Sequence, residues 1–257
     1  MFSTPFSFLA APAGGGGWAP SDLPNLYDWW NPSTGVSLSG SNVLTWTGYN
    51  GTVLSPCTGG NYATFSASDA AWNSQPSILI NPTNAGGEWS YVNTSLTTSV
   101  SSKTIIGVAK MITLSDEKSF IYLSSTVGAR FSTLFRTAGG NTLWGYTDGL
   151  PNASYSTLGV SDVDGSYIFS LNEYYVDGSA INYYASNTST LGTVQKTVTG
   201  RTANFNGFDV INLGGYTPVA TLGCCKFSVV ELIYVAGILS EGDLSSLETY
   251  LASKYAL

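Results

Sequence analysis

The end of the chain constrains the fold most, because two different hydrophobic periods follow one another there. Residues 227–235 read Phe-Ser-Val-Val-Glu-Leu-Ile-Tyr-Val, a run that is β-branched and apolar almost throughout. Such a run is typical of a strand that is covered on both faces, at the centre of a sheet. Gly237 ends the run, so we predict a central strand that stops just before it.

A helical period replaces the strand pattern beyond Gly237. Ser240 is followed three residues later by Asp243, a variant of the capping box that begins many helices. Lys254 falls in the last turn, where the helix dipole favours a cation. The apolar stripe consists of Leu244, Leu247 and Leu251, with Tyr250 and Tyr255 beside it. We therefore predict that the chain ends on a short amphipathic helix.

Short segments rich in β-formers fill most of the remaining sequence. They lie at 43–46, 77–80, 89–92, 104–111, 120–123, 131–135, 143–146, 166–171, 181–184, 194–198 and 209–213. Turn dipeptides separate them, and Asp177-Gly178 between two such segments is the clearest hairpin signal. Many short strands with one helix predict an all-β fold, a two-sheet sandwich or jelly roll.

Two stretches of the sequence resemble a known family. Residues 22–30 read Asp-Leu-Pro-Asn-Leu-Tyr-Asp-Trp-Trp and are followed by Gly35-Val36 and by Val-Leu-Thr-Trp at 43–46. Together with the terminal strand and helix, they resemble the concanavalin A-like lectin/glucanase (laminin-G-like) sandwiches found in tailed-phage virion structural proteins and some secreted bacterial proteins. The resemblance covers residues 22–257 and implies a jelly-roll sandwich over 21–257. Where many relatives carry Asp, the turn after Trp46 reads Thr-Gly-Tyr-Asn-Gly, so no ligand role of that turn is implied.

Residues 1–20 have the composition of an attachment arm rather than of a strand. Its apolar side chains are Phe2, Phe6, Phe8 and Leu9, with Trp18 where it meets the domain. Residues 14–17 are four glycines, which form a flexible hinge. We expect the arm to dock on a neighbouring subunit or a partner protein; the alternative is that it folds back on its own sandwich. A secretory signal is disfavoured, because no Lys or Arg precedes the apolar run and Pro5 interrupts it.

The charged residues are few and scattered, which argues against several function classes. The net charge is −7, and the nine Lys and Arg residues do not cluster, so a nucleic-acid partner is not expected. No apolar run reaches the roughly 20 residues that a membrane-spanning helix needs. The chain has no histidine, the commonest general base. Three cysteines, Cys57, Cys224 and Cys225, leave two alternatives: free thiols, or one disulfide from Cys57 to either of the others.

The carboxylates do not form a catalytic pair in the sequence. Asp162 and Asp164 have the alternating spacing that places two acids on one strand face, but Gly165 follows directly and favours a turn. Glu231 lies within the apolar terminal strand, so it must be paired, protonated or at a bulge. The family that the sequence resembles usually carries an acid at this position, so the resemblance implies a structural acid that binds backbone amides or an arginine such as Arg201. We therefore expect no catalytic residues and a protein that is not an enzyme.

One stretch combines aromatic rings with polar groups that could bind a sugar. It contains Trp144, Tyr146, Asp148, Asn152 and Tyr155, and we interpret it as a long loop. Pyranose rings stack on aromatic rings while Asn and Asp bind hydroxyl groups; the alternative is core packing of Trp144 and a plain turn at Asp148. No cofactor is expected. Calcium is an open option through oxygens of Asp148, Asn152, Asp162 and Asp164, although their spacing matches no dedicated loop.

These observations lead to two functional hypotheses. The first is a non-enzymatic virion structural protein, a capsid decoration or head or tail appendage protein at the virion surface, that binds other virion proteins through its arm and forms a homo-oligomer. The second is a carbohydrate-binding adhesion or receptor-binding module that recognises host surface glycans.

Overall fold

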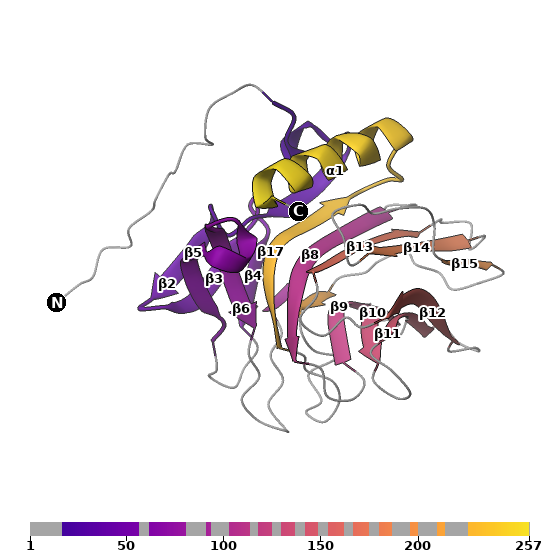
Figure 1. Ribbon diagram of the computed structural model, residues 1–257, viewed down its shortest axis with the longest axis horizontal. Helices are drawn as coiled ribbons and strands as arrows, with labels where there is room; N and C mark the ends of the chain where they lie inside the picture. Colours follow the sequence, from indigo (N-terminus) through magenta and orange to yellow (C-terminus); the bar gives the residue numbers. More distant parts are fainter. Residues whose placement is uncertain are drawn as a thin grey trace.

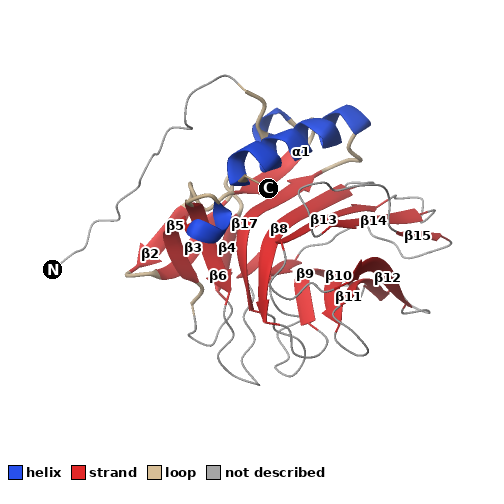
Figure 2. Ribbon diagram, in the orientation of Figure 1, coloured by secondary structure: helices blue, strands red, loops and turns tan. Residues whose placement is uncertain are grey.

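The computed structural model describes the chain in segments. These are residues 17–56, 62–80, 91–93, 103–113, 118–124, 130–136, 142–148, 154–161, 167–174, 180–186, 196–199, 210–213 and 226–256. Side chains are described for 17–56, 62–80, 103–112, 226–256, Ile211 and Leu213. Strands dominate these segments, and one long helix accompanies them (Figure 2).

The first sheet is built around the predicted central strand, β17 (Lys226–Val235). One edge of β17 pairs antiparallel with β8 (Lys103–Thr113), and the other edge pairs with β1 (Leu26–Trp30) and β6 (Gln75–Ile80). All residues of β17 after Lys226 are buried. The prediction of a central strand covered on both faces is therefore confirmed.

Further strands extend this sheet on both sides of β17. Beyond β8 follow β13 (Tyr167–Tyr174), β14 (Ala180–Ser186) and β15 (Lys196–Thr199). Beyond β6 follow β5 (Thr64–Asp69), β3 (Asn42–Thr47) and β2 (Val36–Ser39). The pairing of Tyr174 with Ile181 confirms that β13 and β14 are antiparallel neighbours, as the hairpin signal predicted.

The second sheet is largely a meander. It runs through β9 (Lys118–Ser124), β10 (Arg130–Arg136), β11 (Thr142–Asp148) and β12 (Ser154–Ser161). On the other side of β9 lie β16 (Val210–Leu213), β7 (Tyr91–Asn93) and β4 (Val53–Pro56). β4 also pairs with β3, which joins the two sheets. In Figure 1, β9 to β12 form a layer below β8 and β13 to β15, so the predicted all-β sandwich is confirmed.

The helix α1 (Glu241–Tyr255) covers the face of the first sheet that points away from the second (Figure 1). The Oγ atom of Ser240 accepts a hydrogen bond from the amide of Asp243 at 3.1 Å, and the Asp243 carboxylate accepts one from the amide of Ser240 at 3.2 Å. This confirms the predicted capping box. Leu247, Leu251 and Tyr255 are buried against the sheet in a cluster with Ile106, Val108, Ile233 and Val235.

A second apolar region lies on the opposite face of the first sheet. Trp30 pairs in register with Leu232, and both are buried. Its indole N–H donates to the carbonyl of Thr52 at 2.9 Å. Two 3-10 turns, η1 (Pro20–Asp22) and η2 (Ala70–Trp72), complete the described elements. No helix in the described segments is long and apolar enough to cross a membrane.

Several predictions fall on residues outside the described part of the chain. They concern the arm residues Phe2, Phe6, Phe8 and Leu9, the three cysteines, and Arg201. Trp18 is described: it is half-buried and packs against Tyr250 of α1 in the same chain, with ring centroids 6.2 Å apart.

Candidate functional site

The best-defined polar site lies under the helix and is centred on Glu231. The register of β17 with β8 shifts between Val229 and Glu231, which marks a β-bulge in the middle of the central strand. Glu231 pairs with Val108, a member of the cluster beneath α1, so it lies on the face of the sheet that the helix covers. Its side chain is 0% exposed. The Glu231 carboxyl group therefore lies where water is excluded.

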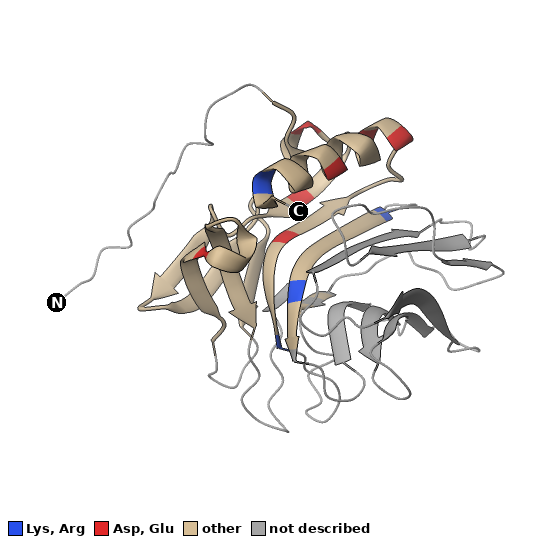
Figure 3. Cartoon of the chain, viewed as in Figure 1, with Lys and Arg blue, Asp and Glu red and all other residues tan. Residues whose placement is uncertain are grey.

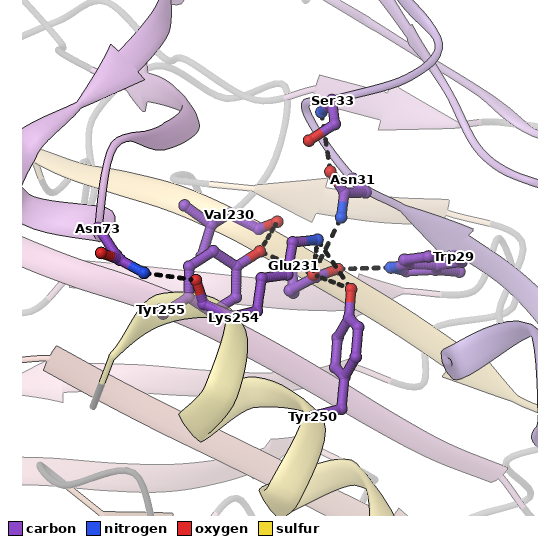
Figure 4. A network of polar contacts seen from close by, with 9 residues as sticks. All are labelled: Trp29, Asn31, Ser33, Asn73, Val230, Glu231, Tyr250, Lys254 and Tyr255. Carbon is purple, nitrogen blue, oxygen red and sulfur yellow. Dashed lines mark hydrogen bonds and ion pairs between the residues drawn. The ribbon is translucent and has the colours of Figure 1, made fainter. Parts of the chain in front are cut away.

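Side chains from β1, from Asn31 directly after it and from α1 surround this carboxylate (Figure 4). Its Oε1 atom accepts hydrogen bonds from Asn31 Nδ2 at 3.0 Å, Tyr250 O–H at 3.0 Å, Lys254 Nζ at 2.9 Å and Tyr255 O–H at 2.7 Å. Its Oε2 atom accepts from the indole N–H of Trp29. Lys254 also balances the charge, because its ammonium group forms an ion pair with Glu231. We call this set of six residues the Glu231 cluster.

The two tyrosines of the cluster act as neutral donors. Burial raises the pKa of Tyr250 and of Tyr255 well above the ordinary value, and the nearby charge of Glu231 raises both pKa values further. Lys254 Nζ additionally donates to the Tyr250 hydroxyl oxygen at 2.7 Å. The same ammonium lies 5.1 Å from the centroid of the Tyr250 ring and 5.9 Å from that of Trp29.

This geometry joins the central strand to the helix and to β1, and it leaves the carboxylate no contact with solvent. The expectation that Glu231 is paired is confirmed. Its partners differ from the predicted ones: the described contacts of its oxygens are side chains rather than backbone amides, and the cation is Lys254. Sequence analysis did not connect these residues, although Tyr250 and Lys254 lie four residues apart and therefore on one face of the helix.

The residues predicted to bind sugar lie in the second sheet. Trp144, Tyr146 and Asp148 alternate along β11, and Tyr146 lies directly opposite Tyr155 of β12 in the register. The alternation and the register assign these four positions to one face of the β11–β12 pair. The prediction of a long loop is therefore wrong: the stretch consists mostly of two paired strands, and Asn152 falls between them in the sequence. Asn152 lies outside the described residues.

The described side chains offer no metal site. No group of three or more His, Cys, Asp or Glu residues in the described part of the chain is arranged to hold a metal ion. Of the four calcium candidates, Asn152, Asp162 and Asp164 fall outside that part.

The fold can be compared with solved structures. No family model matches the chain, and no curated protein does. Domain 4 of AbnA, a GH43 extracellular arabinanase from Geobacillus stearothermophilus, in complex with arabinotriose, is similar with a TM-score of 0.61 and 12% sequence identity. The match covers 87% of this chain and 98% of that domain.

Two other kinds of solved structure are similar to this chain in fold. A GH54 α-L-arabinofuranosidase soaked with 4-nitrophenyl α-L-arabinofuranoside matches with a TM-score of 0.62 and 13% identity, over 92% of this chain and 61% of that one. The receptor-binding domain of botulinum neurotoxin type G matches with a TM-score of 0.59 and 9% identity, over 90% of this chain and 51% of that one. At these identities the similarity concerns the fold. The chain therefore has the β-sandwich fold found in glycosidase-associated and receptor-binding domains.

Proposed function

We propose that this protein is a carbohydrate-binding module without catalytic activity. The observation that carries the proposal is the register of β11 and β12, which groups Trp144, Tyr146, Asp148 and Tyr155 on one face of the second sheet. Three aromatic residues and one acid at positions on one face of a strand pair combine the two kinds of group that sugar binding requires. A sugar ring presents C–H groups to an aromatic face and hydroxyl groups to a carboxylate.

The comparisons support the proposal at the level of the fold. The AbnA domain is in complex with arabinotriose, and the GH54 enzyme was soaked with an arabinofuranoside. Neither protein identifies the sugar for this chain, because the sequence identities are 12% and 13%. A related fold can present quite different binding surfaces.

The proposed absence of catalysis is supported by the burial of Glu231 and by the donors bound to its oxygens. Retaining glycosidases need two carboxyl groups about 5–5.5 Å apart and inverting enzymes about 6.5–9.5 Å, both open to the substrate. Glu231 is fully buried, and five donors occupy its oxygens. It is therefore unable to reach a glycosidic bond without dismantling the cluster.

A glycan microarray probed with the labelled full chain tests the proposed function. We expect binding to a restricted set of glycans, and we expect Tyr146→Ala and Tyr155→Ala to weaken it. Tyr62→Ala is the matched control, because Tyr62 is an exposed tyrosine outside the second sheet. Absence of binding to every glycan, with the chain folded by circular dichroism, contradicts the proposal.

A second candidate function is a structural protein of a virion surface, attached through residues 1–20. Its support is in the sequence: four large apolar side chains precede a run of four glycines. Display on a larger assembly is compatible with glycan binding, since the arm and the β11–β12 pair are different parts of the chain. Deleting residues 1–17 is the test. Loss of incorporation into particles is expected, and normal occupancy of the truncated protein contradicts this role.

A further inference from the structure

A surface turn beside the Glu231 cluster is held in an unusually fixed conformation. It connects β3 to β4 over residues 48–52, and the buried carboxylate of Asp28 organises it. Asp28 Oδ1 accepts the amide of Asn50 at 2.8 Å, and Oδ2 accepts the amide of Thr52 at 2.7 Å. The Asn50 side chain donates back to the carbonyls of Leu26 at 3.2 Å and Tyr27 at 2.9 Å.

Glycines make this close approach feasible. A methyl group on Gly48 would overlap the carboxylate oxygens of Asp28, so only glycine fits there. Gly51 has a φ of +92°, a backbone conformation that other residues rarely adopt. The amide of Gly48 donates to the Thr52 carbonyl at 2.8 Å, which closes the turn. The backbone of residue 49 therefore has one defined position.

The side chain that this turn presents is a tyrosine in solvent. Tyr49 is 63% exposed, and its amide donates to the Trp29 carbonyl at 2.8 Å. Its ring lies 6.1 Å from the Trp29 ring, with 37° between the planes. Trp29 is half-buried and is fixed in turn by its bond to Glu231 and by the edge of Tyr250 at 6.3 Å. The backbone that carries Tyr49 is thus held by hydrogen bonds, and its exposed ring lies next to the half-buried Trp29 ring.

The described groups near these rings include no unpaired cation. Lys254 lies 5.9 Å from the centroid of the Trp29 ring, but its ammonium group is neutralised by Glu231 at 2.9 Å. Asp28 is occupied by backbone amides of the turn and of Trp29. The described groups that contact the rings therefore offer no unbalanced cation for the carboxylate of an acidic sugar. An uncharged ligand with an apolar face fits them best.

We propose that Tyr49 and Trp29 form a second glycan contact, separate from β11–β12, that stacks against the ring of a neutral sugar. The inference rests on the proposed glycan-binding function. The Trp29 ring is held by its bond to Glu231 and the backbone of Tyr49 by hydrogen bonds, so a shallow contact here loses less conformational freedom on binding than one on a flexible loop. The buried acids Asp28 and Glu231 act as positioning residues, each holding one part of the aromatic pair in place.

The test compares Tyr49→Ala and Tyr49→Phe with the unmodified full chain. The probe is an array of neutral glycans, each paired with its sialylated counterpart, followed by titration of the best neutral glycan in solution. We expect Tyr49→Ala to weaken neutral-glycan binding at least about tenfold and Tyr49→Phe to retain most of it. Tyr62→Ala is again the control. Unfolding temperatures verify that each variant is folded.

The outcomes separate this inference from the proposed function. Loss of binding in Tyr49→Ala with retention in Tyr146→Ala and Tyr155→Ala supports the second contact and contradicts a dominant role of β11–β12. Unchanged binding in Tyr49→Ala, with loss in the β11–β12 variants, overturns the second contact and leaves the function intact. A preference for the sialylated member of each pair overturns the assignment to neutral sugars. Failure of the unmodified chain to bind any glycan overturns both.

Discussion

Glu231 illustrates how one residue fixes several elements at once. A carboxylate removed from water is costly unless donors and an opposite charge replace the lost hydration. Here two phenols, an amide, an indole and an ammonium group do so, and they come from β1, from Asn31 directly after it and from α1. Glu231 can be buried without a large loss of stability only when the helix and the central strand meet in the arrangement that brings these donors to its oxygens.

We predict that Lys254→Met destabilises the protein by about 3 kcal/mol, because it leaves the buried Glu231 carboxylate without a counter-charge. Urea denaturation of the full chain measures this difference. A Glu231→Gln variant and the double variant complete a double-mutant cycle, in which we expect a clear coupling between the two positions. Ser253→Ala, an exposed change one residue away, is the control, expected within about 0.5 kcal/mol of the unmodified chain. A Lys254→Met variant as stable as Ser253→Ala would contradict the role of the ion pair.

The tyrosines predict a loss of stability at high pH. Their pKa values are raised in the folded state, so above about pH 10 the unfolded chain loses phenol protons that the folded chain retains. The contribution of the two tyrosines to the free energy of unfolding should therefore be complete below about pH 10 and decrease as the pH rises above it. Burial lowers the pKa of Lys103 to about 8, which acts in the opposite direction between pH 8 and about 10.4. The difference between the unmodified chain and Tyr250→Phe isolates the phenol, and a pH-independent difference would argue against its raised pKa.

At the scale of elements, the helix depends on its first turn as well as on its buried face. Ser240→Ala removes the side-chain acceptor for the Asp243 amide, and we expect a loss of about 1 kcal/mol. Ser245→Ala, an exposed change inside the same helix, should be nearly neutral. Chemical denaturation monitored by circular dichroism compares the two. Equal effects would mean that the cap contributes nothing specific.

Replacing glycine by alanine should change the stability in opposite directions at two positions, Gly48 in the turn after β3 and Gly242 in α1. Gly48→Ala should destabilise the protein by about 1–3 kcal/mol, because its methyl group competes with Asp28 for the same space. Gly242→Ala should instead stabilise it by about 0.5–1 kcal/mol, since Gly242 lies in α1 and a methyl group there meets only Ser240 Oγ at 3.7 Å. The unfolding temperatures of both variants, compared with that of the unmodified chain, test these two changes in stability. Stabilisation by Gly48→Ala would show that Asp28 does not occupy the position described.

The elements that sequence analysis identified correctly are those with a strong local signal. The apolar run of β17 and the capped leucine stripe of α1 are determined by neighbouring residues. β4, β5 and β12 were not identified, because their sequences are short or rich in Ser and Thr and resemble turns. The Glu231 cluster joins residues about 200 positions apart, such as Asn31 and Glu231, and no local pattern contains that information.

At the scale of the whole molecule, the Glu231 cluster lies between the helix and the first sheet, whereas β11 and β12 belong to the second sheet. The helix side holds the Glu231 cluster, in which Trp29 lies next to the exposed Tyr49, and the charged residues coloured in Figure 3 are sparse along the described segments. The second sheet holds Trp144, Tyr146 and Tyr155. Trp29 lies in the first sheet and the β11–β12 pair in the second, so the two proposed glycan contacts belong to different parts of the sandwich.

Saturation-transfer difference NMR tests glycan recognition most directly, using the unmodified full chain and the neutral glycan that binds best on the array. Irradiation of the aromatic protons should transfer saturation mainly to the protons on one face of a single pyranose ring, because stacking brings that face against the rings. Uniform transfer over the whole sugar would contradict stacking as the mode of recognition. No transfer to any glycan of the panel would contradict carbohydrate binding itself.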